Sequence, residues 1–280
     1  MDHDETAGIV LEAELREAVR LQQFELHYQP QVRIANREVV GMEALIRWAH
    51  PTRGLLLPAA FIPAAERNGL IVPIAEWVLR TACAQTRAWH KVGLPALTVA
   101  VNLSALQFRQ TGFVQLVSGI LESTGLDPCF LDLEVTKSLV MGAPETMLAR
   151  FNELRALGIV LSIDDFGTGY ANFGHFMNFP LDQLKIDPAF VHGLPASVES
   201  AAIARAIVSM GSSLGVRVMA VGVENRHQAD FLRSIWCEYA QGYYYCMPLP
   251  AGEFETWARN AVGDADADAR ETGREFMLAA

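Results

Sequence analysis

The stretch Leu161-Ser-Ile-Asp-Asp-Phe-Gly-Thr-Gly-Tyr170 decides how this chain is interpreted. An apolar run typical of a β-strand ends in two adjacent carboxylates, Asp164 and Asp165, and a loop with glycines at 167 and 169 follows. Two neighbouring negative charges repel each other unless a cation is bound, so the pair indicates a hard divalent metal ion beneath a closing loop. An Asp pair that only caps a turn explains these ten residues equally well, and the rest of the chain has to distinguish the two.

The composition is that of a globular protein, with 51% hydrophobic and 19% charged residues in a chain of 280. The net charge of −10 and the absence of any run of Lys or Arg argue against general nucleic-acid binding. The four cysteines form no Cys-x-x-Cys pair, as is typical of reduced thiols. No signal peptide or uninterrupted apolar stretch of membrane-spanning length is visible, so we expect a cytoplasmic chain.

Extended apolar runs alternate with segments of helical period along the whole chain. Helical stripes are predicted at Glu145–Leu157, followed by Gly158 as a C-cap, and at Ala201–Leu214 and Gln228–Ile235. Strands are predicted at Glu25–Val32, Val39–Trp48, Leu97–Leu103, Phe130–Val135, Ile159–Ile163, Gln183–Ile186, Val216–Val221 and Tyr239–Tyr244.

Only residues 34–37 separate the first two strands, too few for a crossover helix, so these strands should form an antiparallel hairpin. The pattern predicts an α/β fold, a (β/α)₈ TIM-like barrel with an antiparallel first strand. We expect one domain over residues 9–260. Residues 261–280 are predicted to be an acidic, alanine-rich and flexible tail.

In barrels of this kind the chemistry lies at the carboxyl ends of the strands. Each polar residue at a predicted strand end has a structural explanation as a cap or turn former, but their repetition on successive strands indicates a site. These residues are Glu43, Arg47, Asn102, Glu134, Asp164, Asp165, Lys185, Asp187, Glu224 and Gln241.

With these residues in view, the chain resembles the EAL family of cyclic di-GMP phosphodiesterase domains. The matching motifs occur in order along the chain and make the resemblance specific. They are Tyr28-Gln-Pro-Gln31, Glu43-Ala-Leu45 with Arg47-Trp48, Asn102-Leu-Ser104, Glu134-Val-Thr136, Asp164-Asp-Phe-Gly-Thr-Gly169, Lys185-Ile-Asp187, Gly222-Val-Glu224 and Gln241-Gly-Tyr243.

The resemblance implies a metal-dependent site for a cyclic dinucleotide. It assigns Mg²⁺ or Mn²⁺ as cofactor, with a first ion held by Glu43, Asn102, Glu134 and Asp164 and a second ion beside Asp165. It implies catalytic positions at Lys185, which contacts the attacking water, at Asp165 and at Glu224. The implied ligand-binding residues are Gln29, Arg47, Asp187 and Gln241. The implied loop over the site comprises Phe166, Gly167, Thr168 and Gly169, with Lys137 at the position of its anchor.

Two positions depart from the pattern of active family members. Val221 occupies the place of a carboxylate that binds the second metal or acts as general base, and valine can do neither. Lys137 stands where active members usually carry a glutamate that anchors the loop, and a lysine cannot accept the same hydrogen bonds. The first metal site is therefore expected to be complete and the second compromised.

Three functions remain open from the sequence. The first is a receptor that binds cyclic di-GMP with weak or absent hydrolysis, and the second is an active phosphodiesterase that yields pGpG. The third is a protein-interaction module without nucleotide binding. The family also implies a homodimer, and the helical segment Gly8–Leu21 is typical of an entry from an upstream sensory or GGDEF module or a partner protein.

Overall fold

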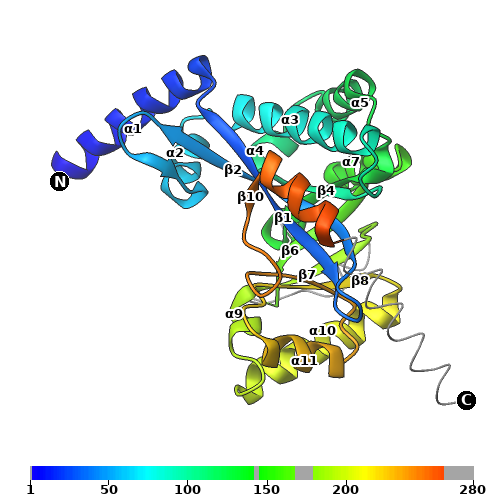
Figure 1. The fold of residues 1–280 in the computed structure, drawn as a ribbon. Helices are drawn as coiled ribbons and strands as arrows, with labels where there is room; N and C mark the ends of the chain where they lie inside the picture. The colour runs from blue at the N-terminus through cyan, green and yellow to red at the C-terminus, as the bar shows by residue number, and fades with distance from the viewer. Residues whose placement is uncertain (1, 142–144, 168–178, 262–280) are drawn as a thin grey trace, which may run out of the picture.

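A closed eight-stranded barrel forms the centre of the computed structural model, which describes residues 2–141, 145–167 and 179–261 (Figure 1). Its strands are β1 (Phe24–Arg33), β2 (Val39–His50), β4 (Thr98–Leu103), β5 (Leu131–Thr136), β6 (Val160–Phe166), β7 (Gln183–Ile186), β8 (Arg217–Val221) and β9 (Tyr239–Gln241). Two short strands, β3 (Gly54–Leu56) and β10 (Leu249–Pro250), pair with β2 and β1 outside the closed ring.

The direction of β1 confirms the predicted topology. β1 runs antiparallel to both of its barrel neighbours, β2 and β9, whereas the ladders from β2 through β4, β5, β6, β7 and β8 to β9 are all parallel. The turn between β1 and β2 is too short to carry the chain back across the sheet, so the two strands can only form a hairpin. Consequently the carboxyl ends of seven strands meet at one end of the barrel.

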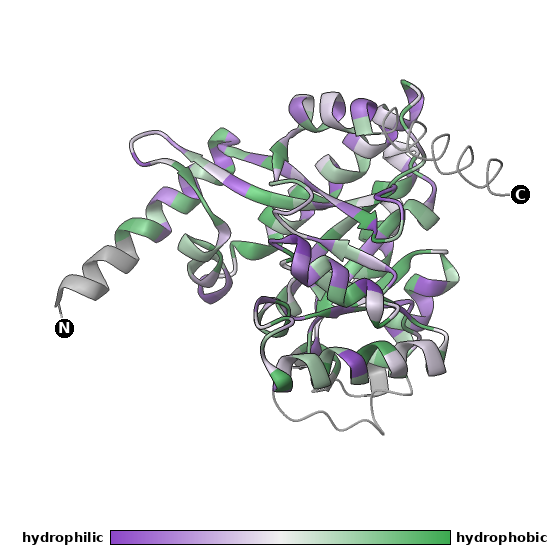
Figure 2. Ribbon diagram, turned by 60° about the horizontal axis from the view of Figure 1, so that its bottom comes forward, coloured by the Kyte–Doolittle hydropathy of each residue, from purple (hydrophilic) through white to green (hydrophobic). Residues whose placement is uncertain are grey.

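Helices cover the outside of the barrel, with α3, α5 and α7 on one side and α9, α10 and α11 on the other (Figure 1). The helices are α1 (Asp2–Leu21), α2 (Ile62–Arg67), α3 (Ile71–Lys91), α4 (Ala105–Phe108), α5 (Phe113–Thr124), α6 (Lys137–Met141), α7 (Glu145–Ala156), α9 (Pro188–His192), α10 (Val198–Leu214), α11 (Arg226–Ser234) and a last helix over 251–261. Hydrophilic and hydrophobic residues alternate along the outer helices, as amphipathic helices require (Figure 2).

The termini of these helices follow from local chemistry. Gly158, just after α7, has a φ of 93°, which is the left-handed conformation that the sequence predicted for this C-cap. Helix α10 begins where the Ser197 side chain accepts a hydrogen bond from the Ser200 amide, and it ends at Gly215 with a φ of 67°. These two helices end a few residues before the strands that follow them, β6 and β8.

The largest differences from the predicted strand ends are at β9 and β6. β9 ends at Gln241 rather than Tyr244, because the backbone at Gly242 packs directly on Val223, where a Cβ would lie 2.1 Å from the Val223 carbonyl oxygen. β6 continues to Phe166 rather than ending at Ile163, with a register shift against β7 between these two residues. This bulge places both Asp164 and Asp165 within the strand itself.

The last described helix, over residues 251–261, packs against the outside of the barrel at β1. Phe254 is fully buried, and its ring lies 5.0 Å from that of Trp89 on α3 and 5.9 Å from that of Tyr28 on β1. The helix therefore packs against the antiparallel strand that completes the ring. The predicted tail lies beyond residue 261, outside the described residues, and the boundaries at 9 and 260 stay a prediction. No helix in the described part of the chain has the length and apolarity to cross a bilayer.

Candidate active site at the carboxyl ends of the strands

A buried lysine bridges two buried glutamates at the carboxyl end of the barrel. The Nζ atom of Lys185 on β7 lies 3.1 Å from Oε2 of Glu43 on β2 and 2.5 Å from Oε1 of Glu134 on β5. All three side chains are almost inaccessible to solvent. Because 51 and 142 residues separate Lys185 from these partners, closure of the barrel creates the cluster.

Glu43 is the most highly connected carboxylate of the cluster. Its Oε1 atom accepts a hydrogen bond from Nδ2 of Asn102 at 2.7 Å, and its Oε2 atom accepts one from Nε2 of Gln241 at 2.6 Å in addition to that from Lys185. Asn102 lies opposite Glu134 in the β4–β5 ladder, and its strand β4 lies between the two strands that carry the glutamates. The orientation of Glu43 is therefore determined by three separate strands.

A glutamine network extends the cluster to β1. Nε2 of Gln241 also donates to Oε1 of Gln29 at 2.9 Å, and Oε1 of Gln241 accepts from Nε2 of Gln31 at 3.2 Å. The sequence analysis assigned Gln29 and Gln241 but gave no role to Gln31. Its position two residues after Gln29 on the same strand face was the signal that could have identified it.

The charges of the cluster shift its pKa values in different directions. Burial disfavours the ionised form of Glu43, but the Lys185 charge and the hydrogen bonds from Gln241 and Asn102 outweigh it, so that its pKa is lowered. Burial and then the negative charge of Glu43 raise the pKa of Glu134 well above its usual value. Burial opposes the charge of Lys185, yet both glutamates together raise its pKa, so the lysine stays protonated.

The Asp pair from the opening stretch lies at the rim beside this cluster. Asp164 is opposite Thr136 in the β5–β6 ladder, and its Oδ1 atom accepts a hydrogen bond from the amide of Asp165 at 2.9 Å. Asp165 has a φ of 56° and is exposed. Burial of part of the side chain and then the neighbouring Asp164 charge raise the pKa of Asp165. Asp165 is thus the more exposed carboxylate of the pair.

The remaining predicted residues lie around the rim. Arg47 is buried on β2, and its Nη1 atom donates to the Ile46 carbonyl at 2.9 Å. Asp187 caps α9 by accepting a hydrogen bond from the Ala189 amide at 2.7 Å. Glu224 is about half exposed and pairs with His192, with 3.4 Å between Oε1 and Nε2, rather than with the buried cluster.

The predicted loop is described only in part. Phe166 is buried at the end of β6, and the space around Gly167 is so tight that a Cβ would lie 2.7 Å from the Phe190 ring. Lys137 begins α6 directly after β5 and is partly exposed. Thr168 and Gly169 lie outside the described residues.

Val221 points into the mouth of the barrel next to these groups. It is opposite Gln241 in the β8–β9 ladder, and two residues earlier Met219 is opposite the buried Lys185 in the β7–β8 ladder. Because side chains alternate along a strand, Val221 and Met219 lie on the face that carries Lys185 and Gln241. An apolar side chain therefore occupies a position at the polar end of the barrel.

The donor set suits a hard divalent cation in its chemistry, because carboxylate and amide oxygens are the ligands that Mg²⁺ and Mn²⁺ prefer. Oε2 of Glu134 is buried without a hydrogen-bond partner, an unsatisfied acceptor at the centre of the cluster. Within the described residues, no three His, Cys, Asp or Glu side chains are grouped as a ready metal site. Lys185 occupies the position between Glu43 and Glu134.

A second polar pair lies deeper in the barrel, and the sequence analysis did not identify it. Asp132 precedes Glu134 by two residues on β5, and its Oδ2 atom accepts a hydrogen bond from the Ser162 hydroxyl at 2.6 Å. Both side chains are buried, and Oδ1 of Asp132 has no hydrogen-bond partner. Burial raises the pKa of Asp132 to about 6, although the hydrogen bond from Ser162 opposes the shift.

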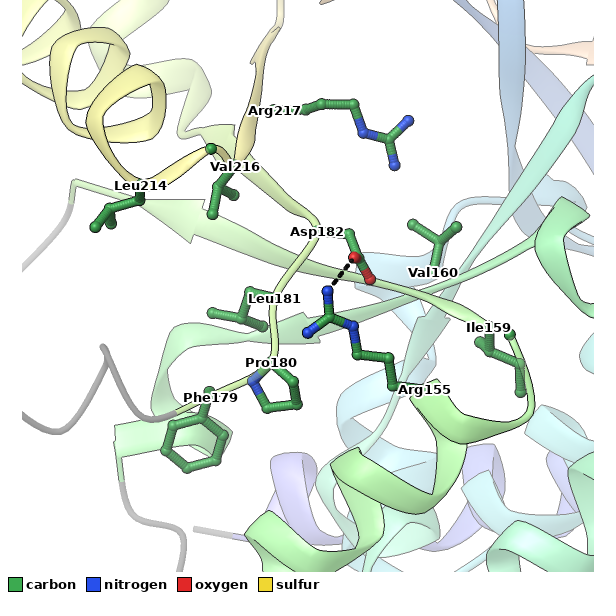
Figure 3. Close-up of a pocket in the computed structure, with 12 residues that line it drawn as sticks. Arg155, Ile159, Val160, Phe179, Pro180, Leu181, Asp182, Leu214, Val216 and Arg217 are labelled. Atoms are coloured by element: carbon green, nitrogen blue, oxygen red, sulfur yellow. Dashed lines mark hydrogen bonds and ion pairs between the residues drawn. The ribbon is translucent and has the colours of Figure 1, made fainter.

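A large hollow lies at the opposite end of the barrel, where β6, β7 and β8 begin (Figure 3). It has a volume of about 740 Å³, and Arg155 pairs with Asp182 across it at 3.3 Å. Its lining residues Val160 and Arg217 are the first residues of β6 and β8. This hollow is therefore separate from the Lys185 cluster, and the density of buried ionisable groups favours the cluster as the functional site.

Comparison with known proteins identifies the class that this fold and site define. Residues 12–248 match the family described as the EAL domain, and the chain belongs to that family. The chain is 45% identical to the cyclic di-GMP phosphodiesterase NbdA of Pseudomonas aeruginosa over 260 residues, which is 93% of this chain and 33% of NbdA. It is 44% identical to the bifunctional diguanylate cyclase/cyclic di-GMP phosphodiesterase MucR of the same organism over 238 residues, 85% of this chain and 35% of MucR.

The solved structures agree with this assignment. The MucR phosphodiesterase in complex with cyclic di-GMP superimposes with a TM-score of 0.84 at 43% identity, covering 87% of this chain and 99% of that one. The chain spans about a third of the length of the curated relatives described above. The functions of those longer proteins as a whole are therefore not assigned to this chain.

Proposed function

We propose that this EAL domain binds cyclic di-GMP as a signalling receptor and hydrolyses it weakly or not at all. Two observations support the proposal together. The buried cluster of Glu43, Glu134 and Lys185 retains the polar groups expected at a dinucleotide site, whereas Val221 places a hydrocarbon at the same barrel mouth. The observation that carries the proposal is the position of Val221, because a hydrocarbon there impairs hydrolysis and leaves the binding residues in place.

The proposed binding residues surround the mouth of the barrel. Arg47 holds a phosphate of the ligand, because a guanidinium donates two parallel hydrogen bonds to phosphate oxygens. Gln29, Gln241 and Asp187 supply amide and carboxylate groups around the ligand. Since Gln29 and Gln241 already orient each other through a 2.9 Å hydrogen bond, this part of the site is formed before the ligand binds.

Glu43, Asn102, Glu134 and Asp164 are the proposed ligands of one Mg²⁺ or Mn²⁺ ion. When bound, such an ion polarises a phosphoryl oxygen and lowers the pKa of a coordinated water. The chain's own residues orient the site: Asn102 and Gln241 hold Glu43, and the unsatisfied Oε2 of Glu134 is available for coordination. Lys185 neutralises part of the carboxylate charge and is the proposed contact of the attacking water.

The proposed second metal position is incomplete. Asp165 contributes a carboxylate at the rim, but Val221 can neither coordinate a cation nor accept a proton. Glu224 does not replace the missing group, because it pairs with His192 outside the buried cluster. Loss of a general base alone lowers rates by about 10²–10⁴-fold. Lys137 at the proposed anchor of the loop carries the opposite charge to the expected glutamate and adds to the impairment.

Two other functions compete with the receptor. The identity of 45% to a protein named as a cyclic di-GMP phosphodiesterase favours an active enzyme that releases pGpG, in which another group replaces the carboxylate absent at Val221. A protein-interaction module without nucleotide binding is less well supported, since unused carboxylates around Glu134 would remain buried without benefit.

Titration calorimetry with cyclic di-GMP, combined with a pGpG assay in Mg²⁺ and Mn²⁺, distinguishes the three functions. Saturable binding with little or no pGpG supports the receptor. Rapid pGpG formation would refute it in favour of the enzyme, and absence of binding would favour the interaction module. The same measurements on Arg47→Ala, with Arg80→Ala on the exposed face of α3 as control, test the proposed phosphate contact.

The location, oligomeric state and regulatory input of the domain are also part of the proposal. We propose a cytoplasmic domain that forms a homodimer and receives its input through α1 from an upstream sensory or GGDEF module or from a partner protein. Helix α1 is tied to the barrel, because Glu14 forms an ion pair with Arg53 and lies 3.5 Å from His50 at the end of β2. Analytical ultracentrifugation with and without cyclic di-GMP would measure the oligomeric state.

A further inference from the structure

A second group of cationic side chains lies on the outer wall of the barrel, away from the Lys185 cluster. Arg37 in the β1–β2 turn and Arg226 and Arg233 on α11 line a hollow of about 250 Å³ together with Tyr244 and Tyr245. Among the described residues that line it, Asp230 is the only one with a carboxylate. Three guanidinium groups against one carboxylate leave a local charge of about +2 on a chain whose net charge is −10.

The arginines of this hollow retain hydrogen-bond donors, although Nη2 of Arg233 donates to the Ile34 carbonyl at 2.9 Å. Asp230 is shared between Arg226 and Arg233, with both N···O distances at 3.3 Å, longer than about 2.7–2.9 Å for a good charge-assisted hydrogen bond. Arg37 forms no ion pair with any described residue. Its Nη2 atom instead donates to the Tyr244 hydroxyl at 2.8 Å, and the guanidinium lies 5.3 Å from the centre of that ring.

The two tyrosines that line the hollow, Tyr244 and Tyr245, supply an independent observation. The hydroxyl oxygen of Tyr245 is buried and has no hydrogen-bond partner, which is unusual for a phenol in a native structure. Burial raises the pKa of Tyr245 to about 12, so its hydroxyl keeps its proton and can donate it to an acceptor. Tyr245 thus brings an unused donor into the wall of the hollow that Arg37, which forms no ion pair with any described residue, also lines.

We propose that Arg37, Arg226, Arg233 and Tyr245 form a binding site for a phosphate group, either free phosphate or a phosphate monoester. The donors come from three places: the β1–β2 turn, helix α11 and the segment with Tyr245. Such an arrangement suits a tetrahedral group with three free oxygens better than a planar carboxylate, which offers two. The hollow has room for the phosphate and a small substituent, which the aromatic wall would contact.

The position of this site connects it to the barrel mouth. The carbonyl of Cys246, next to Tyr245, accepts a hydrogen bond from Nε2 of Gln29 at 3.1 Å, and Gln29 in turn accepts one from Gln241. A phosphate group held by Tyr245 would therefore restrain the segment that orients Gln29. Binding at the hollow itself does not depend on the proposed binding of cyclic di-GMP.

The test uses the full chain in a low-chloride buffer of constant ionic strength, with inorganic phosphate and phenyl phosphate as probes. Isothermal calorimetry measures affinity, and NMR follows the arginine Nε–Hε signals. We expect saturable binding with shifts at Arg37, Arg226 and Arg233. Tighter binding of phenyl phosphate would identify a monoester as the natural form, and equal binding would identify free phosphate.

Matched variants decide whether the observed binding belongs to this site. Arg37 has a φ of 57°, a conformation that Asn tolerates, so Arg37→Asn removes the charge and keeps the turn. This change should weaken phosphate binding about tenfold or more, and Tyr245→Phe should weaken it several-fold. Arg80→Asn, which removes an exposed arginine from α3, should have no effect.

Two results would overturn the proposal. One is the absence of saturable phosphate binding by the wild-type chain. The other is an equal affinity of wild type, Arg37→Asn and Tyr245→Phe, which would locate the bound phosphate elsewhere. If Arg37→Asn proves unfolded by circular dichroism, Tyr245→Phe still decides the question, since it removes a single oxygen atom and keeps the ring.

Discussion

Val221 lies opposite Gln241 across the β8–β9 ladder, so a methyl-bearing side chain stands beside an amide whose two N–H groups are both used to orient Gln29 and Glu43. Val221 is therefore the position at which we propose that a carboxylate is missing. Repairing the position is the most direct test of the proposed impairment.

We expect Val221→Glu to raise pGpG formation at least about tenfold over wild type, because it restores a proton acceptor and oxygen ligand at the barrel mouth. The neutral Val221→Gln variant has nearly the same shape and controls for size. Its turnover should stay at the wild-type level. If Val221→Glu gives no increase while it still binds cyclic di-GMP, the missing carboxylate is not the main defect and Lys137 or the loop limits turnover.

Replacing Lys185 by Met should destabilise the domain by about 3–5 kcal/mol, because Glu43 and Glu134 would be left buried with their charges uncompensated. Urea unfolding in EDTA measures the loss, and addition of Mg²⁺ should recover part of it. The exposed Lys91 at the end of α3 provides the control, since Lys91→Met should change stability by less than about 0.5 kcal/mol. Equal stabilities of the two variants would contradict the buried ion-pair network.

Glu134→Gln should separate apo stability from metal binding. Without metal, the variant should be at least as stable as wild type, because a surplus buried carboxylate is removed. Mg²⁺ at about 100 times its Kd should stabilise wild type by about 2.7 kcal/mol and leave the variant nearly unchanged. Thermal melts with and without Mg²⁺ measure this difference. Glu38→Gln, on the exposed surface, should respond to Mg²⁺ as wild type does.

Metal binding should also release protons. Burial and the Glu43 charge raise the pKa of Glu134, and only its ionised form coordinates a cation. Metal affinity should therefore fall as the pH is lowered through this raised pKa and rise as the pH increases. Calorimetric titrations with Mn²⁺ in buffers of different ionisation enthalpy measure the protons released. A binding enthalpy that is independent of the buffer would contradict the raised pKa.

Asp132→Asn should change the pH dependence of stability. Burial raises the pKa of Asp132 from 3.8 to about 6 in the folded state, so the folded chain binds more protons than the unfolded chain between these values. Wild-type stability should therefore fall as pH rises from about 4 to above 6, and the Asn variant should lack this part of the fall, worth about 1–3 kcal/mol. Urea midpoints measured at pH 4.5 and 8 test the difference. A Glu76→Gln control, on the surface of α3, should retain the wild-type profile.

Most strands of the barrel could be predicted from the sequence, because the residues that indicate each strand or turn lie within that strand or turn. Apolar runs of strand length and the short 34–37 turn predicted eight strands with the first reversed, and the closed sheet confirms this topology. The prediction was wrong at the end of β9, because the contact of Gly242 with Val223 depends on a neighbouring strand. It was also wrong at the end of β6, where a bulge keeps Asp164 and Asp165 within the strand.

The sequence by itself determined which polar residues stand at the carboxyl ends of the strands, and hence the family, because motif spacing and strand period are properties of the chain. Only the tertiary structure decided that Lys185 lies between Glu43 and Glu134, that Gln31 joins Gln241, and that Glu224 pairs with His192 instead of the cluster. These partners come from different strands and loops, and their contacts depend on the register and closure of the barrel. In the same way, Arg37 and α11 are almost 200 residues apart along the chain, and folding alone brings them to one hollow.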